Sequence, residues 1–279
     1  MFSKRNIGIL ISYILSFIIL LMIFYISINK YDIEYIVEGP YDHLEKNNYD
    51  FSNVDSDSIY KEYIGNDGYS SIIGVTISQQ DGDVNWYKVS GTDVDFAMIS
   101  AGYRDKKTGL LIVDDYFENN VQKANLNNVP IGIYFTSNAL NEIEAKEEAN
   151  FVIDLIKDAE ITYPIAYYSK GADDAYRCNL LTKENFTSNA EAFATVIKNN
   201  NYTPMIYLHD IWYEKHYDLN VISQYDIWYA QSEIYPSFEY EFDIWKYTET
   251  GYVDGVETPV AISMHLIKDG INPYMAKDN

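Results

Sequence analysis

The sequence predicts an α/β fold: an irregular TIM-like β/α barrel of about eight strands, preceded by one N-terminal transmembrane helix. Three observations predict it, namely an uncharged apolar run near the N-terminus, eight short apolar segments after residue 70, and amphipathic stretches between several of these segments. Strands that alternate with helical stretches are typical of a parallel sheet, and eight such units close into a barrel.

The apolar run IGILISYILSFIILLMIFYISI, residues 7–28, contains no charged residue. As a helix it would measure roughly 33 Å, which is enough to cross a bilayer. It is too long for the core of a cleaved signal peptide, and a buried core helix of this length would carry a polar face. Because Lys4 and Arg5 precede it, the positive-inside tendency places residues 1–6 in the cytoplasm. We therefore expect a single-pass protein of the cell membrane with an extracellular barrel domain.

The charge balance limits the partners of this domain. The chain has 20 basic and 42 acidic residues, and Lys4 and Arg5 are the only charges before residue 29, so the remainder carries 18 − 42 = −24 charges. Such a charge argues against nucleic acid as a partner. Cys178 is the single cysteine and is expected to be a structural thiol. The histidines show no metal-ligand spacing and no nucleotide-binding motif occurs, so we expect neither a metal nor a cofactor.

Residues 29–69 are rich in Asp, Asn, Ser and Tyr and show no sustained periodicity, so we expect a polar stalk there and a barrel domain over residues 70–279. The predicted strands cover 72–78, 95–101, 131–136, 164–169, 204–208, 226–230, 242–247 and 260–266. Helices are predicted within 142–159 and 181–201, the second with Thr182 as its N-cap. Little helix separates the last three strands, which makes the barrel irregular. The carboxyl ends of its strands would form the functional rim.

Seven segments carry a resemblance to a known family. They are GVTISQQDGDVNW (74–86), VDFAMISAGYR (94–104), DDYFENNVQKAN (114–125), PIGIYFTS (130–137), YTPMIYL (202–208), YDIWYAQ (225–231) and IWKYTETGYVDGV (244–256). In this order they resemble the glycoside hydrolase family 25 lysozymes, the Chalaropsis-type muramidases. The resemblance implies cleavage of the β-1,4 link between N-acetylmuramic acid and N-acetylglucosamine, with carboxylic acids set around the mouth of the barrel.

The positions at which the family carries these acids hold other residues in this sequence. The first strand has Thr76 where the family has Asp, and the central strand has Tyr168 and Lys170 where the family has Asp-x-Glu, the Glu being the proton donor. The last strand has Ala261 where the family has a fourth acid. Loss of general acid catalysis alone costs a factor of about 10²–10⁴ in rate. We therefore expect a divergent member without useful lysozyme turnover.

Other carboxylates lie near these strands. Asp81, Asp83, Asp173 and Asp174 fall in loops just beyond the first and central strands and are candidate replacement acids. Ordinary turn chemistry explains the same residues, since Asp favours turns.

Aromatic side chains suit sugar rings, because they offer an apolar face with a polar edge. The candidate glycan contacts are Tyr103, Tyr134, Tyr168, Tyr207 and Trp245. Core packing is the alternative, and we favour it for Trp86, Trp228 and Trp245.

Three functions stay open from the sequence. The first is an inactive, membrane-anchored domain that binds peptidoglycan or another cell-wall glycan. The second is a non-enzymatic scaffold that binds a protein partner in a cell-envelope complex. The third is a weakly active glycosidase that uses other carboxylates, which would have to face each other about 5–10 Å apart.

Overall fold

The computed structural model describes residues 4–29, 39–55, 60–65, 67–169 and 177–275, and the chain forms two compact units, residues 1–43 and 44–279. The first unit contains helix α1 (Lys4–Asn29), which includes the predicted membrane segment. Among the described residues, no helix meets the length and apolarity required of a membrane span. The anchor over residues 7–28 therefore stays a prediction.

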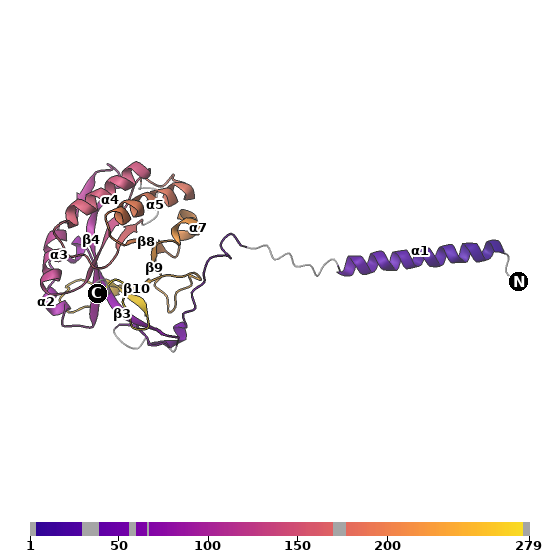
Figure 1. The fold of residues 1–279 in the computed structure, drawn as a ribbon, viewed down its shortest axis with the longest axis horizontal. Coiled ribbons are helices and arrows are strands. Elements are labelled where there is room, and N and C mark those ends of the chain that lie inside the picture. The colour runs from indigo at the N-terminus through magenta and orange to yellow at the C-terminus, as the bar shows by residue number, and fades with distance from the viewer. Residues whose placement is uncertain (1–3, 30–38, 56–59, 66, 170–176, 276–279) are drawn as a thin grey trace. The chain divides into compact units, whose positions relative to one another are not determined.

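The second unit is a closed barrel of eight strands with helices around it (Figure 1). Each of the eight predicted strands is present, with bounds shifted by a few residues. The barrel strands are β3 (Tyr69–Ile77), β4 (Val94–Arg104), β6 (Ile131–Thr136), β7 (Ile165–Tyr168), β8 (Pro204–His209), β9 (Asp226–Ala230), β10 (Ile244–Gly251) and β11 (Val260–Lys268).

Closure of the barrel depends on its last strand. The order β3-β11-β10-β9-β8-β7-β6-β4 returns to β3 through a parallel β3–β4 pairing, and the short strand β5 (Leu111–Val113) adds to the edge of β4. Seven barrel strands run parallel, whereas β11 is antiparallel to both of its neighbours. Because β11 runs the opposite way, its first residues lie at the same end of the barrel as the last residues of β3. This end is the mouth.

The helices follow the strands as the sequence pattern predicts. They are α2 (Trp86–Val89), α3 (Phe117–Leu126), α4 (Glu142–Ile156), α5 (Lys183–Asn199), α6 (Tyr213–His216) and α7 (Leu219–Ile222), with 3₁₀ turns η2 (Phe51–Asn53) and η3 (Gln79–Asp81). Thr182 caps α5 as predicted, because its hydroxyl accepts from Asn185 N and the Asn185 side chain bonds back to Thr182. Helices α4 and α5 lie side by side on the outside of the barrel (Figure 1).

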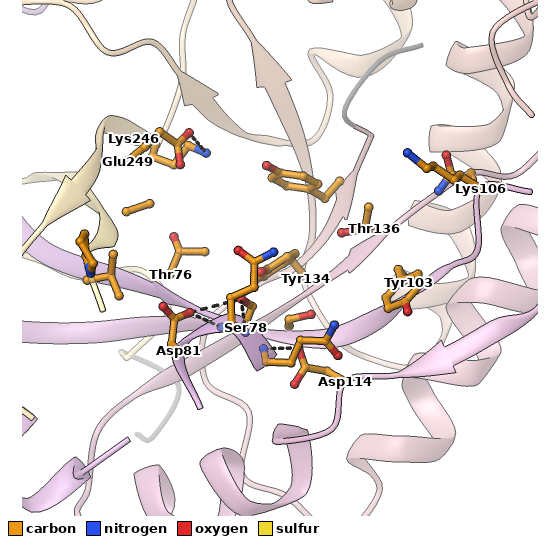
Figure 2. A pocket seen from close by; sticks show the side chains of 18 of the residues that line it. Thr76, Ser78, Asp81, Tyr103, Lys106, Asp114, Tyr134, Thr136, Lys246 and Glu249 are labelled. Carbon is orange, nitrogen blue, oxygen red and sulfur yellow. Dashed lines mark hydrogen bonds and ion pairs between the residues drawn. The ribbon is translucent and has the colours of Figure 1, made fainter. Parts of the chain in front are cut away.

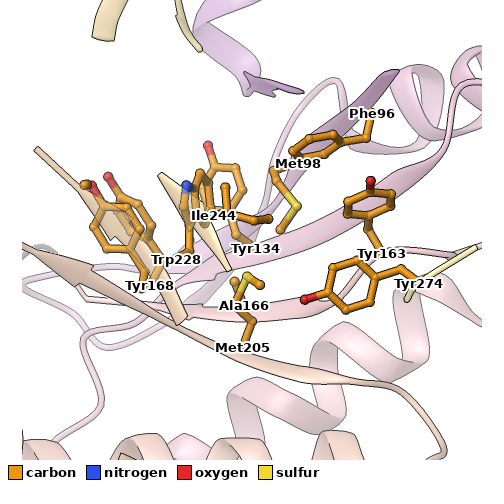
Figure 3. Close-up of a cluster of buried hydrophobic side chains, with 12 residues drawn as sticks. Phe96, Met98, Tyr134, Tyr163, Ala166, Tyr168, Met205, Trp228, Ile244 and Tyr274 are labelled. Atoms are coloured by element: carbon orange, nitrogen blue, oxygen red, sulfur yellow. The ribbon is translucent and has the colours of Figure 1, made fainter. Parts of the chain in front are cut away.

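Large aromatic side chains fill the barrel interior (Figure 3). Tyr134, Tyr168 and Trp228 pack together in one part of this cluster, and Phe96 and Tyr163 stack at 4.4 Å in another. Elsewhere in the domain, Trp86 is 1% exposed and Trp245 is fully buried. Core packing is thus confirmed for Trp86, Trp228 and Trp245.

The compact unit starts earlier than the sequence suggested. Residues 44–55 and 60–65 lie along the barrel, and β1 (Val54–Asp55) pairs antiparallel with β2 (Glu62–Tyr63). Asn47 Nδ2 donates to the carbonyls of Phe238 and Tyr240. Phe51 packs edge-on against Trp245 at 5.5 Å. A stalk that reaches residue 69 is therefore wrong, because aromatic and amide side chains spaced without periodicity fix described parts of residues 44–55 and 60–65 to the barrel.

Candidate functional site

A cavity of about 400 Å³ opens at the mouth of the barrel (Figure 2). It lies where the carboxyl ends of β3, β4, β6 and β7 meet the start of β11, which is the functional end of this kind of barrel. Its walls hold hydroxyl and amide groups, three tyrosines and several charged side chains. The residues that line it include Thr76, Gln79, Asp81, Ser100, Tyr103, Asp105, Lys106, Asp114, Tyr134, Thr136, Asn138, Tyr168, Lys246, Glu249 and Ala261.

Three of the four positions at which the resemblance places an acid line this cavity. Thr76 and Ala261 are paired in register across β3 and β11, and Tyr168 is the last residue of β7. None of the three carries a carboxylate. Thr76 Oγ1 is buried and has no hydrogen-bond partner among the described residues. The fourth position, Lys170, lies outside the residues that the structure describes.

A lysine that the sequence analysis did not single out lies at the same mouth. Lys246 is only 3% exposed, and its Nζ lies 2.6 Å from Glu249 Oε1. The ammonium also lies 4.9 Å from the centre of the Tyr207 ring and 5.7 Å from that of Tyr168. These two rings are in contact, with centroids 3.9 Å apart. The signal in the sequence was the one charged residue within the apolar and aromatic stretch IWKY, residues 244–247.

The candidate replacement acids are held in structural roles where the structure describes them. Asp81 accepts from Ser78 N at 2.9 Å in a capping box for η3 and from Thr258 Oγ1 at 2.6 Å. Asp83 does not line the cavity, and hydrogen bonds from Lys123 and Asn119 lower the pKa of its carboxyl. Asp173 and Asp174 lie outside the described residues.

Asp114 is a further carboxylate in the cavity wall, and the sequence analysis did not propose it as a site residue. It is 4% exposed and accepts from Gln79 N at 2.7 Å and from Tyr116 N at 3.0 Å. Burial raises the pKa of this carboxyl in spite of these hydrogen bonds. A buried acid with a raised pKa in a cleft is the type of group that serves as a general acid.

The predicted glycan contacts fall into two groups. Tyr103, Tyr134 and Tyr168 line the cavity, with Tyr103 the most exposed of the three. Tyr207 is 1% exposed and Trp245 is fully buried, and neither is part of the cavity wall. The structure therefore removes Tyr207 and Trp245 from the candidate glycan contacts, because both side chains are enclosed by protein. Trp245 Nε1 donates to Gln231 O, and Lys61 Nζ lies 4.6 Å above its ring.

Comparison with known families decides the identity of the barrel. The sequence profile of the glycosyl hydrolases family 25 matches residues 75–256, which span most of the barrel. The chain belongs to glycosyl hydrolase family 25. Comparison with curated proteins gave no match.

Solved structures of family 25 type share the fold. The modular autolysin LytC from Streptococcus pneumoniae, in complex with a synthetic peptidoglycan ligand, has 22% identity and a TM-score of 0.62 over 70% of this chain and 46% of that one. A family 25 glycosyl hydrolase from Bacillus anthracis has 21% identity and a TM-score of 0.57 over 72% and 91% of the two chains. The bacterial lysozyme from Streptomyces coelicolor has 19% identity and a TM-score of 0.55 over 70% and 91%. The matched part spans less than half of LytC.

Proposed function

We propose that this family 25 barrel is catalytically silent and binds peptidoglycan or another cell-wall glycan at its mouth. The observation that carries the proposal is the set Thr76, Tyr168 and Ala261, which occupy the acid positions of the cavity wall without a carboxylate. Hydrolysis of a glycosidic bond needs a carboxylic acid that protonates the leaving oxygen and usually a second carboxylate at the oxocarbenium-like centre. A hydroxyl, a phenol and a methyl group supply neither.

The remaining charges at the mouth support the loss of catalysis. The Glu249 carboxylate is engaged by the Lys246 ammonium at 2.6 Å, so it is not an unpaired acid or nucleophile. Asp81 and Asp114 each accept two or more hydrogen bonds from the loops that they hold.

The walls of the cavity favour a sugar ligand. Tyr103, Tyr134 and Tyr168 offer aromatic surface, and Ser100, Thr136 and Asn138 are among the hydrogen-bonding groups around it. This mixture of ring faces and small polar groups matches the C–H faces and hydroxyl rims of a pyranose. The synthetic peptidoglycan ligand in the LytC complex gives the ligand class by analogy.

We further propose that residues 7–28 anchor the protein in the cell membrane, with residues 1–6 in the cytoplasm and the barrel on the extracellular side. The support is the uncharged sequence of this segment and the two basic residues Lys4 and Arg5 that precede it. Such an anchor together with a glycan-binding barrel would connect the membrane to the cell wall. Protease digestion of intact cells, followed by detection of the barrel and the N-terminus separately, tests this orientation.

The function is tested by incubation of the detergent-solubilised chain with purified, insoluble peptidoglycan. Reducing-end release and co-sedimentation are measured in the same tubes. We expect sedimentation without release, and weaker sedimentation for Tyr103→Ala but not for the matched variant Tyr87→Ala, whose side chain is 79% exposed and lies outside the cavity.

Two other outcomes would contradict the proposal. Reducing-end release that disappears in Asp114→Asn or Asp81→Asn would show an active glycosidase that uses other carboxylates. The absence of both reducing-end release and sedimentation would favour a scaffold for an envelope protein.

A further inference from the structure

A second cavity, of about 530 Å³, lies at the opposite end of the barrel from the mouth. Its wall includes Asp226, the first residue of β9, and Asp243, which directly precedes β10. Strands β9 and β10 are parallel neighbours, so their first residues come together at the base of the barrel. The base thereby brings two carboxyl groups close to each other, far from the cavity proposed to bind glycan.

The two carboxyl groups have different hydrogen-bond partners. Asp243 Oδ2 accepts from Ile227 N at 2.8 Å, which ties it to the backbone of β9. Asp226 Oδ2 accepts from the hydroxyl of Tyr274 at 2.8 Å. Within the described part of the chain, neither carboxylate forms a salt bridge. Two ionised carboxylates at this place would therefore repel each other without a paired cation.

Tyr274 fixes the C-terminal segment to the base. It is 7% exposed and belongs to the core cluster of the barrel. Its ring stacks on His265 at 4.9 Å and lies 5.0 Å from the ring of Tyr163, beside which it is seen in Figure 3. Asn272 Nδ2 donates to Tyr163 OH at 2.7 Å. The segment 272–274 thus closes the base through ring contacts and two side-chain hydrogen bonds, one of which ends on Asp226.

The surrounding charges are mostly negative. Burial raises the pKa of both Asp243 and Glu241. The charge of Glu241, which precedes β10, raises the pKa of Asp243 further, and the charge of Glu45 raises that of Glu241. On β11, Lys268 is the one cation among the described residues of the cavity wall, and its Nζ lies 5.9 Å over the Tyr69 ring.

The other titratable groups at the base are uncharged or acidic. Burial lowers the pKa of His265 to about 4, so its imidazole is neutral at physiological pH. Tyr49 lines the cavity, and burial raises the pKa of its phenol well above the ordinary value. Asp95 of β4 faces Tyr163, and Asp269 follows β11 in the cavity wall. Among the described residues of the cavity wall, Lys268 is thus the one group that could offset a second negative charge, and it forms no salt bridge with Asp226 or Asp243.

We propose that Asp226, Asp243 and Tyr274 form a pH-sensitive latch that holds the C-terminal segment against the base of the barrel. The latch is closed while the pair of carboxyl groups keeps one proton. In this state Asp243 is protonated, and Asp226 is ionised and accepts the hydrogen bond from Tyr274 OH. Ionisation of Asp243 adds a second charge, and the repulsion moves the Asp226 carboxylate toward the cavity and away from Tyr274. Burial and the neighbouring Asp226 charge raise the pKa of Asp243 to about 7, which sets the pH range of the change.

The test is hydrogen exchange of the full chain in detergent micelles at pH 6 and pH 8.5, with rates corrected for the intrinsic pH dependence. Protection of the backbone amides in residues 271–275 should fall by about tenfold or more at the higher pH, the size expected for loss of one hydrogen bond to a charged group. Amides of α5 should keep their protection. The variant Asp243→Asn should show the same protection of residues 271–275 at both pH values.

A second variant separates the latch from general destabilisation. Tyr274→Phe keeps the ring contacts but removes the hydroxyl, so residues 271–275 should exchange rapidly already at pH 6. Equal protection at both pH values in the wild-type chain would overturn the proposal. A fall in protection that persists unchanged in Asp243→Asn would overturn it as well.

Discussion

Lys246 and Glu249 form an ion pair of 2.6 Å at the mouth of the barrel, with the lysine side chain 4% exposed and the glutamate side chain 55% exposed. The lysine is thus desolvated while its partner is half in solvent. A buried ammonium needs a counter-charge, because the charged form loses its hydration. Glu249 supplies that charge from the rim, and the Tyr168 and Tyr207 rings supply aromatic faces below it.

We therefore expect Glu249→Gln to lower the free energy of unfolding by about 1.5–3 kcal/mol, the usual range for a hydrogen bond to a charged group. The measurement is urea unfolding at neutral pH. Glu257→Gln is the matched control, since Glu257 is exposed and forms no ion pair among the described residues, and it should change stability by less than about 0.5 kcal/mol. Equal effects of the two substitutions would show that the pair at the mouth contributes nothing.

Tyr207 and Tyr103 should respond in opposite ways to truncation. Tyr207 is 1% exposed and packs on Tyr168 and Trp228, so Tyr207→Ala should cost about 3–5 kcal/mol of stability, as loss of a buried aromatic ring does. Tyr103→Ala should leave stability nearly unchanged and weaken co-sedimentation with peptidoglycan. Thermal unfolding and co-sedimentation measured on both variants check this. A stable Tyr207→Ala variant with lost glycan binding would return Tyr207 to the glycan site.

The positions of the strands could be predicted because each is a short apolar run bounded by polar residues. Whether a given side chain points into the barrel or toward the helices could not be predicted. Strands such as PMIYLH are buried on both faces, so their sequence does not distinguish the barrel interior from the layer under the helices. For this reason the sequence places Tyr207 in the groove, and it leaves Trp245 a candidate glycan contact although core packing is favoured. The antiparallel direction of β11 could not be predicted either, because the pattern of apolar residues in a buried strand is the same for a parallel and an antiparallel strand.

The candidate site was predictable only in outline. The resemblance placed Thr76, Tyr168 and Ala261 at one end of the barrel, and the structure brings all three to one cavity. Asp114 and Lys246 were missed, because their contribution depends on burial that the sequence does not give. Residues 44–55 and 60–65 could not be assigned to the domain from the sequence, because their contacts with the barrel come from single aromatic and amide side chains without a periodic spacing.

A buried ion pair links β4 to α4 outside the barrel. Arg104 is 4% exposed and donates from Nε to Glu148 Oε1 at 2.8 Å, while its other nitrogens donate to the carbonyls of Gly109 and Glu144. Arg104→Met leaves the fully buried Glu148 without its counter-charge and should cost about 3–5 kcal/mol in urea unfolding.

Replacement of both partners gives the decisive comparison for this pair. The double variant Arg104→Met/Glu148→Leu should recover much of the loss, since a buried ion pair can be exchanged for apolar side chains at little cost. Lys146→Met, which removes an exposed pair with Glu142 at 3.5 Å, should change stability by less than about 1 kcal/mol. A double variant less stable than the single one would mean that the two residues act independently.

His216 should make the barrel less stable in acid. Its ring is stacked against Phe186 at 4.0 Å and Trp212 at 5.9 Å, and burial, with a smaller effect of Lys215, lowers its pKa to about 4. Between pH 6.5 and about 4 the unfolded chain binds a proton at this histidine that the folded chain does not bind, so unfolding becomes more favourable as the pH falls. His216→Phe removes this contribution and keeps the stacking.

The free energy of unfolding, measured in urea from pH 7 to pH 4, should therefore fall more steeply for the wild-type chain than for the variant. His265, whose pKa burial also lowers to about 4, is present in both proteins and cancels in the difference. Parallel curves would mean that the His216 ring takes up its proton within the folded barrel.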